Sequence, residues 1–332
     1  MRVAAAAPSA PVPPPAASVP VVRFAVMIEG QEGVTWDEWV AIAQACERLG
    51  FEALFRSDHY SSIDEVGGRG SLDAWGTLCA LAAVTSELRL GTLVSPATFR
   101  HPSVLARNAV TADQVSGGRV ELGIGTGWHE REHRAHGFAF PAMRTRMDRL
   151  AEQLEIIHGS WADGPFDFAG EHWSLEQLDA RPKPVQDPLP VVMGGAAGPR
   201  GAALAARWAA EYNVVHASPA DAAAAGQRLD AACERAGRDP ATLCHSLMQT
   251  VVIGADEDDM RARAARLAEW EREPPDVEGL RRDRIAGTPA EVIARLREYE
   301  AAGIGRVMIQ HLLHGDVEAL ELIAAEVAPA FA

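Results

Sequence analysis

The chain has 332 residues, of which 48% are hydrophobic and 23% are charged, and its formal net charge is -15. This composition is typical of a folded protein with a large apolar core, and it excludes a disordered chain. The negative charge argues against nonspecific binding to nucleic acid or to an anionic membrane, because both require a basic surface. The four cysteines form no CxxC pair. We therefore expect neither a disulfide framework nor a cysteine zinc site, and we expect reduced thiols in a cytoplasmic protein.

The first segment, residues 1–21, consists mostly of alanine, proline and valine. A secretory signal is one interpretation, but Arg2 supplies only a thin basic region and the prolines interrupt the apolar core that a signal needs. We therefore expect a disordered tail, or a start codon assigned too early. A single domain is predicted over residues 22–332, and the chain has no apolar run of the length that spans a membrane, about 18 residues or more.

Eight short apolar runs follow, each bounded by the glycine, proline or polar residues that flank buried strands. They cover residues 22–28, 53–56, 88–94, 120–124, 191–193, 211–216, 246–253 and 306–310. Helical sequence follows each run; one helix opens on the capping box Thr35-Trp36-Asp37-Glu38 and the last is expected over residues 318–331. Alternation of strands and helices implies a parallel sheet, and eight such units favour an α/β fold of the (β/α)8 TIM barrel type over an open sheet.

Two segments, residues 159–190 and 272–287, are longer than ordinary connections. The first could contain a hairpin near residues 165–175. We expect at least one of these insertions to cover the mouth of the barrel.

Polar residues follow the second and third strands, at the end where parallel α/β folds gather their ligands. Asp58 and His59 come first, and a histidine held by a carboxylate can hydrogen-bond or protonate a reacting group near neutral pH. The alternative is a histidine that merely caps the strand. Thr92, Leu93 and Val94 close the third strand, where a flat ring could lie against the backbone or the chain could simply turn.

Glycines follow the fourth and fifth strands. Gly123, Gly125 and Gly127 are spaced as GxGxG and are followed by Trp128, so they fail the dinucleotide-binding fingerprint. We interpret them as allowing a ring or a substrate to approach the strand end. The pair Gly194-Gly195 precedes an alanine-rich helix and is the better phosphate cradle, because free backbone N–H groups and a helix dipole would meet there. A simple turn is the alternative.

The run His129-Glu130-Arg131-Glu132-His133 matches the HExxH motif of zinc peptidases, and Glu152 follows where a third ligand could stand. On a helix the two imidazoles would share one face, with Glu130 as general base. However, Gly125 to Gly127 leave little helix before His129, Gly137 soon follows His133, and a loop at a barrel mouth is the wrong context. We keep a zinc peptidase as an alternative and predict no metal.

The strings LGTLV, TFRHP, SGGR, ELGIGTGWHE and HGFAFP, all within residues 88–140, resemble the bacterial luciferase-like superfamily of flavin and deazaflavin oxidoreductases. Within it they most resemble the actinobacterial branch that depends on coenzyme F420. The resemblance implies the same barrel, contact of His59 with the cofactor ring, and a non-prolyl cis peptide between Leu93 and Val94. It also implies that Trp128 forms a wall of the pocket and that Glu132 faces the cofactor.

Relatives that act on sugar phosphates and pterins carry a glutamate where this chain has Trp128, which leaves the catalytic acid open between Glu130 and Glu132. Arg281, Arg282 and Arg284 could reach an anionic substrate or the polyglutamate tail of F420, although an exposed charged loop is the more common explanation.

We therefore predict hydride transfer between F420 and a small organic substrate, with His59 as ring contact or proton donor and Asp58 orienting it. An FMN-dependent monooxygenase that uses reduced flavin and molecular oxygen is the main alternative. A non-catalytic flavin-binding barrel is a third hypothesis, and the zinc peptidase is the fourth. The resemblance also leaves a homodimer open, although no apolar stripe identifies an interface.

Overall fold

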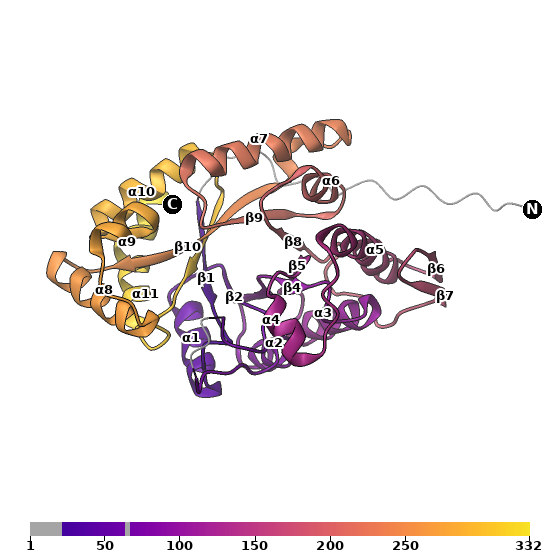
Figure 1. Cartoon of the computed structure of the whole chain (residues 1–332), viewed down its shortest axis with the longest axis horizontal. Helices are drawn as coiled ribbons and strands as arrows, with labels where there is room; N and C mark the ends of the chain where they lie inside the picture. The colour runs from indigo at the N-terminus through magenta and orange to yellow at the C-terminus, as the bar shows by residue number, and fades with distance from the viewer. Residues whose placement is uncertain (1–21, 64–66) are drawn as a thin grey trace, which may run out of the picture.

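The computed structural model describes residues 22–63 and 67–332, so the predicted tail lies outside the described residues. Within these ranges eight parallel strands form a closed barrel, because β12 pairs back to β1 (Figure 1). In barrel order they are β1 (Arg23–Ile28), β2 (Ala53–Arg56), β3 (Arg89–Thr92), β5 (Val120–Gly125), β8 (Val191–Gly194), β9 (Glu211–Val215), β10 (Cys244–Ile253) and β12 (Arg306–Gln310). The predicted TIM barrel is confirmed.

Helices surround the strands on the outside of the barrel (Figure 1). They include α1 (Trp36–Arg48), α2 (Ala74–Val84), α3 (Pro102–Ser116), α5 (Met143–Trp161), α6 (Pro199–Trp208), α7 (Pro219–Arg235), α8 (Glu257–Glu271), α10 (Pro289–Ala301) and α11 (Val317–Leu322). The predicted capping box opens α1: the amide of Glu38 donates to Thr35 and the amide of Thr35 donates back to the Glu38 carboxylate. The last helix is shorter than predicted, because a π-helical turn over Ile323–Val327 and a 3-10 turn over Ala328–Phe331 follow α11.

Ion pairs fill the barrel interior at the amino ends of the strands. Arg306, at the start of β12, lies 2.7 Å from the Glu121 carboxylate and 3.0 Å from that of Glu211. Burial works against the charge of Arg306, but the two carboxylates outweigh it and raise the pKa of its guanidinium. Because these side chains plug one end, the opposite end, where the strands terminate, is where the barrel can open.

The connections add short elements. β3 ends at Thr92, two residues before the predicted end, and β4 (Ser95–Pro96) then pairs with β5. The predicted hairpin is β6 (Phe166–Ala169) with β7 (Ser174–Leu178), and it packs beside α5 at the edge of the molecule (Figure 1).

The other long segment holds α9 (Val277–Asp283) and β11 (Ile285–Gly287), and β11 pairs with β10. This segment reaches the mouth of the barrel through Arg284, as expected for one of the two insertions. A further helix, α4 (Glu130–His136), lies in the connection after β5.

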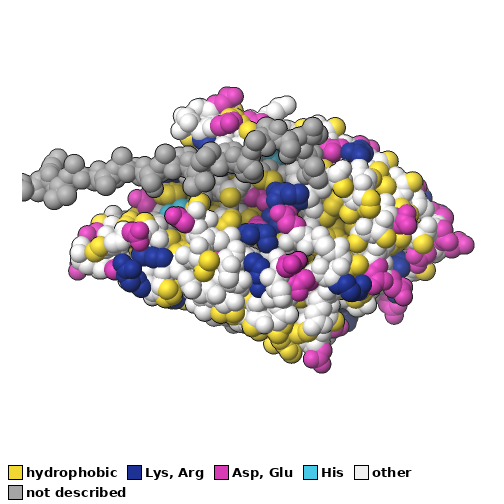
Figure 2. Space-filling model, turned by 180° about the vertical axis from the view of Figure 1, so that it is seen from behind, with side chains coloured by type: hydrophobic (Ala, Val, Ile, Leu, Met, Phe, Trp, Pro, Cys, Tyr) yellow, Lys and Arg dark blue, Asp and Glu magenta, His cyan; other side chains and the backbone are white. Residues whose placement is uncertain are grey.

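The surface seen in Figure 2 carries acidic and basic side chains interspersed with each other, outside the part covered by grey atoms. Among the described residues no helix is both long enough and apolar enough to cross a membrane.

Candidate functional site

A cavity of about 550 Å³ opens at the carboxyl ends of the barrel strands. This volume lies within the range of small-molecule sites. Most of the predicted site residues line it, namely His59, Leu93, Val94, Gly125, Gly127, Trp128, Gly194 and Gly195. Asp58, Thr92 and Glu132 are buried behind its wall.

His59 follows β2 and points into the cavity. Its Nδ1 atom lies 2.7 Å from Oε2 of Glu132, on α4. The other oxygen of Glu132 accepts hydrogen bonds from the backbone amides of Tyr60 and Ser61, at 2.5 and 3.1 Å. An ionised carboxylate only accepts hydrogen bonds, so the Glu132 oxygen that faces His59 requires an N–H donor. Nδ1 of His59 therefore carries a hydrogen, and Nε2 is the ring nitrogen left for a ligand.

Two opposing effects act on the pKa of His59. Burial disfavours the charged imidazolium and is the largest single effect, and it lowers the pKa. The hydrogen bond and charge of Glu132, with smaller contributions from the charges of Glu29 and Asp58, outweigh burial and raise the pKa above its ordinary value. The pKa of Glu132 is lowered in turn, because the His59 bond and two backbone amides overcome burial. The pair therefore favours a protonated histidine beside an ionised glutamate.

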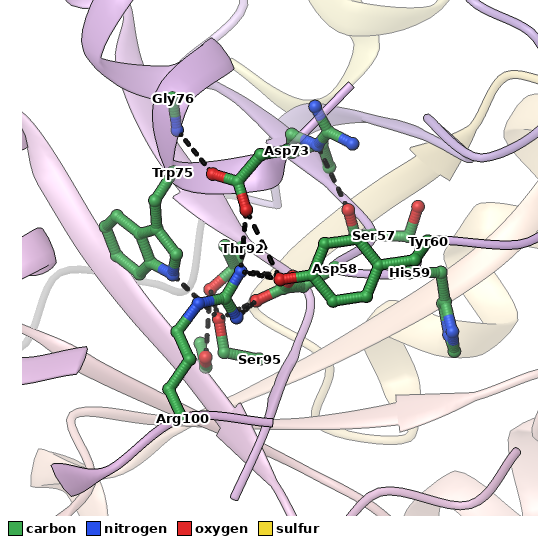
Figure 3. Close-up of polar contacts among 12 residues, drawn as sticks. Ser57, Asp58, His59, Tyr60, Asp73, Trp75, Gly76, Thr92, Ser95 and Arg100 are labelled. Atoms are coloured by element: carbon green, nitrogen blue, oxygen red, sulfur yellow. Dashed lines mark hydrogen bonds and ion pairs between the residues drawn. The ribbon is translucent and has the colours of Figure 1, made fainter. Parts of the chain in front are cut away.

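Asp58 does not orient His59, which corrects the prediction. Its carboxylate is gripped by both terminal nitrogens of Arg100, at 2.5 and 3.0 Å, and accepts from the Ser95 hydroxyl at 2.6 Å. Figure 3 shows the His59 ring turned away from this cluster, which Asp73 also joins through Arg100. Consecutive residues of an extended chain point to opposite sides, so neighbours in sequence are poor partners here. Asp58 instead ties the loop after β2 to β4.

The turn after β3 is held by contacts between residues of the chain. The Leu93–Val94 peptide is cis, as predicted. Thr92 was expected to bind the cofactor, but its hydroxyl donates to the backbone carbonyl of Gly123 at 2.9 Å, inside the wall. A β-carbon on Gly123 would stand 1.7 Å from the Thr92 carbonyl oxygen, and one on Gly125 would stand 2.8 Å from the Val94 side chain. Both glycines make room for the turn, and Gly125 also lines the cavity, so its predicted contact with a cofactor stays a prediction.

Gly127 and Trp128 begin the loop after β5. Gly127 has a φ of 77°, which favours glycine, and a β-carbon there would stand 2.7 Å from the Thr98 hydroxyl. The Trp128 side chain is exposed and contacts His59 edge to face, with ring centroids 5.8 Å apart. It forms a wall of the cavity, as predicted.

The predicted phosphate cradle is only partly available. The amide of Gly195 already donates to the Asn213 carbonyl, and that of Ala197 donates to the Tyr212 hydroxyl, at 3.1 and 3.0 Å. The first turn of α6 begins at Pro199, which has no N–H, so it offers only the amides of the residues around that proline. Anion binding here would therefore rest on α6 more than on the glycine pair.

Three of the residues that the zinc-peptidase alternative needs, His133, Glu130 and Glu152, have structural partners. His133 bonds the Thr98 hydroxyl and the His129 carbonyl, each at 2.7 Å, so both of its ring nitrogens are engaged. The Glu152 carboxylate accepts backbone amides from the β6–β7 turn. Glu130 pairs with Arg134 on the exposed face of α4. Among the described residues no group of three histidine, cysteine, aspartate or glutamate side chains could hold a metal ion.

The three arginines of the segment after α8 differ in position. Arg281 and Arg282 pair with acidic neighbours, Glu257 and Asp283 among them. Arg284 lines the cavity and pairs with Glu271 at 2.7 Å. Only this third arginine is placed where it could meet a ligand.

A polar group after β1 was missed from the sequence. Glu29 and Gln31 line the cavity, and Gln310 at the end of β12 joins them. The amides of Gln31 and Gln310 donate to Glu29 at 2.9 and 2.6 Å. The signal was present, because Glu29 directly follows the strand predicted over residues 22–28 and Gln310 ends the strand predicted over residues 306–310, both at the ligand-binding end.

Comparison with known proteins agrees with this geometry. The profile of the luciferase-like monooxygenase family matches residues 21–306. Pyrimidine monooxygenase RutA of Stutzerimonas stutzeri is 32% identical over 280 residues, which is 80% of this chain and 69% of that protein. F420-dependent hydroxymycolic acid dehydrogenase of Mycobacterium tuberculosis is 33% identical over 264 residues, 78% of this chain and 69% of that protein.

Solved structures share the fold. F420-dependent tetrahydromethanopterin reductase from Methanopyrus kandleri gives a TM-score of 0.77 at 22% identity, covering 94% of this chain and 99% of that chain. Monooxygenase RslO1 from Streptomyces bottropensis gives 0.81 at 21% identity, covering 94% of this chain and 100% of that chain. The chain therefore belongs to the luciferase-like monooxygenase family, whose enzymes include both F420-dependent and flavin-dependent oxidoreductases.

Proposed function

We propose that this protein is an oxidoreductase that transfers a hydride between coenzyme F420 and a small organic substrate. The observation that carries the proposal is the pairing of His59 with Glu132 on the wall of the cavity. The pair supplies a buried proton donor whose pKa is raised, beside a cavity of suitable size for a ring and a small molecule.

The deazaflavin, when bound, would supply the carbon that gives or accepts the hydride. His59 manages the proton. When a hydride reaches a carbonyl carbon, the oxygen becomes an alkoxide and takes the proton from Nε2 of His59. In the opposite direction Nε2 takes the proton of a hydroxyl group as the hydride leaves. Glu132 holds Nδ1 throughout and stabilises the imidazolium.

One side of the cavity supports the placement of a flat ring. Leu93 and Val94 present an apolar surface at the end of β3, and Trp128 closes the neighbouring edge. A phosphate would lie near Gly194-Gly195 and the first turn of α6. The amide of Gly195 would not bind it, because that amide donates to the Asn213 carbonyl. Apolar walls of this kind also exclude water from the reacting atoms.

The choice of F420 is supported by the 33% identity to an F420-dependent dehydrogenase. The second candidate is a monooxygenase that uses reduced FMN and molecular oxygen, and the 32% identity to RutA favours it. The same cavity could hold either ring.

Turnover separates these two functions. The full chain would be incubated without oxygen, either with oxidised F420 and a panel of alcohols or with reduced F420 and the matching carbonyl compounds, while the deazaflavin absorbance is followed. We expect turnover with at least one pair, and loss of most of it in His59→Asn, because the proton donor is gone. Substrate oxidation only with reduced FMN and oxygen would overturn the proposal.

A further inference from the structure

Glu29 lies at the end of β1, lines the cavity and is held by a directed chain of hydrogen bonds. The Thr250 hydroxyl donates to Oε1 of Gln310 at 2.6 Å, and the Gln310 amide donates to Glu29. On the other side the Ser57 hydroxyl donates to Oε1 of Gln31, and the Gln31 amide donates to Glu29.

These bonds present only donors to the carboxyl group of Glu29. Each glutamine accepts through its oxygen from a hydroxyl, so each turns its NH2 group toward Glu29. The two oxygens of Glu29 therefore each accept one N–H. Two donors, one on each oxygen, match the acceptor-only inventory of a carboxylate.

Glu29 differs from the other acidic residues of the cavity in that its bonded partners carry no charge. Among the described residues that line the cavity the carboxylates are Glu29, Glu32 and Glu271. Glu32 pairs with Arg69 at 3.1 Å and Glu271 pairs with Arg284 at 2.7 Å. The partners of Glu29 are neutral amides.

The charges behind the wall also balance. Glu132 faces the His59 imidazole. Behind the wall Arg100 also pairs with Asp58 and Asp73, and the charge of Arg56 interacts with both of these carboxylates. Among the described residues that line the cavity, Glu29 is thus the one carboxylate without a cation in direct contact, although its charge interacts with the His59 imidazole. Each oxygen of Glu29 keeps acceptor capacity for a further donor.

We propose that Glu29 receives an O–H or N–H donor of the substrate, so that the site takes a neutral alcohol or a protonated amine and rejects the matching carboxylate. A second anion would lie beside Glu29 in an environment of low dielectric and would be repelled. This inference rests on the proposed function only in taking the cavity as the substrate site.

Three probes of one shape test it: benzyl alcohol, benzylammonium and benzoate. Binding of each would be measured by calorimetry near neutral pH on the full chain saturated with whichever of F420 or FMN it binds. We expect benzyl alcohol and benzylammonium to bind, and benzoate to bind at least about tenfold more weakly, which is the size of one hydrogen bond to a charged group. Equal or tighter binding of benzoate, or no binding of any probe, contradicts the proposal. The wild-type chain is sufficient for this test.

Two variants locate the effect. Glu29→Gln should abolish the preference for benzylammonium, tighten benzoate and leave the affinity for the cofactor unchanged. Glu32→Gln is the matched control. It removes a carboxylate from the same cavity, but the Glu32 carboxylate is already paired with Arg69. An equal change in both variants, or a change in cofactor affinity alone in Glu29→Gln, would show that Glu29 does not contact the substrate. Absence of any F420-dependent turnover alongside the expected ranking would remove the proposed function and leave this inference standing.

Discussion

Nδ1 of His59 lies 2.7 Å from Oε2 of Glu132, although 73 positions separate the two residues in the sequence. The end of β2 carries the histidine, and the loop after β5 carries the glutamate on α4. The same glutamate holds two backbone amides of the β2 loop, so it fixes the ring and its support together. This contact joins the fold to the proposed chemistry.

Replacing Glu132 by glutamine should lower the pKa of His59. The charge and strong hydrogen bond that oppose burial would be lost, and burial alone favours the neutral imidazole. NMR titration of the His59 ring proton in both proteins measures this. Asp58→Asn should lower the pKa less, since Asp58 acts only through space. A larger decrease of the His59 pKa in Asp58→Asn than in Glu132→Gln would support the pairing of Asp58 with His59 that the sequence predicted.

The stability that His59 contributes should depend on pH in a definite direction. Its pKa in the folded state is raised above the ordinary value of 6.5. The contribution is therefore fully present below that ordinary value, and it is lost as the pH rises through the folded-state pKa. Urea unfolding of the wild type and His59→Gln over a pH series gives the difference in free energy of unfolding. The difference should shrink with rising pH, and growth with pH would contradict the ion pair.

Asp58→Asn should be strongly destabilising even though Asp58 does not line the cavity. It would leave the buried guanidinium of Arg100 without its bidentate partner, and breaking such a pair costs about 3–5 kcal/mol. Urea unfolding provides the number. Glu130→Ala is the matched control, because its pair with Arg134 is exposed and should change stability by no more than about 0.5 kcal/mol. Similar small effects in both would mean that the Arg100 cluster is not structural.

The role of Gly125 can be tested by compensation. Gly125→Ala should cost about 1–3 kcal/mol of stability, because the new methyl group meets the Val94 side chain. Adding Val94→Ala removes that side chain and should recover part of the loss. Gly123→Ala should show no such recovery, because its methyl group meets the Thr92 backbone carbonyl. A Gly125→Ala protein of normal stability with weakened cofactor binding would instead favour direct contact with a ring.

The barrel was predictable because each strand is a short apolar run with polar residues at its end, a pattern that depends on local sequence alone. The cavity position followed, since parallel strands end at one edge. The hydrogen-bond partners of the site residues could not be predicted in this way. Asp58 and His59 are adjacent, yet they face opposite sides, and Glu132 and Arg100 reach them from distant loops.

The neighbours of the glycines were not predictable for a related reason. Small residues at a strand end indicate close packing, but the sequence does not say whether a ligand or the chain itself is the neighbour. At Gly123 and Gly125 the neighbour is the turn of β3. Glu29 was not among the predicted site residues. A lone carboxylate after a strand is usually solvated, and only the bonds from Gln31 and Gln310, which depend on the fold, distinguish it.

The most direct test of the proposed cofactor is an equilibrium titration of the apoprotein with F420 and, separately, with FMN. Tryptophan fluorescence reports on both, because Trp128 and Trp270 line the cavity. We predict saturable, stoichiometric quenching by F420 at lower concentrations than by FMN. Tight binding of FMN with none of F420 would contradict the account.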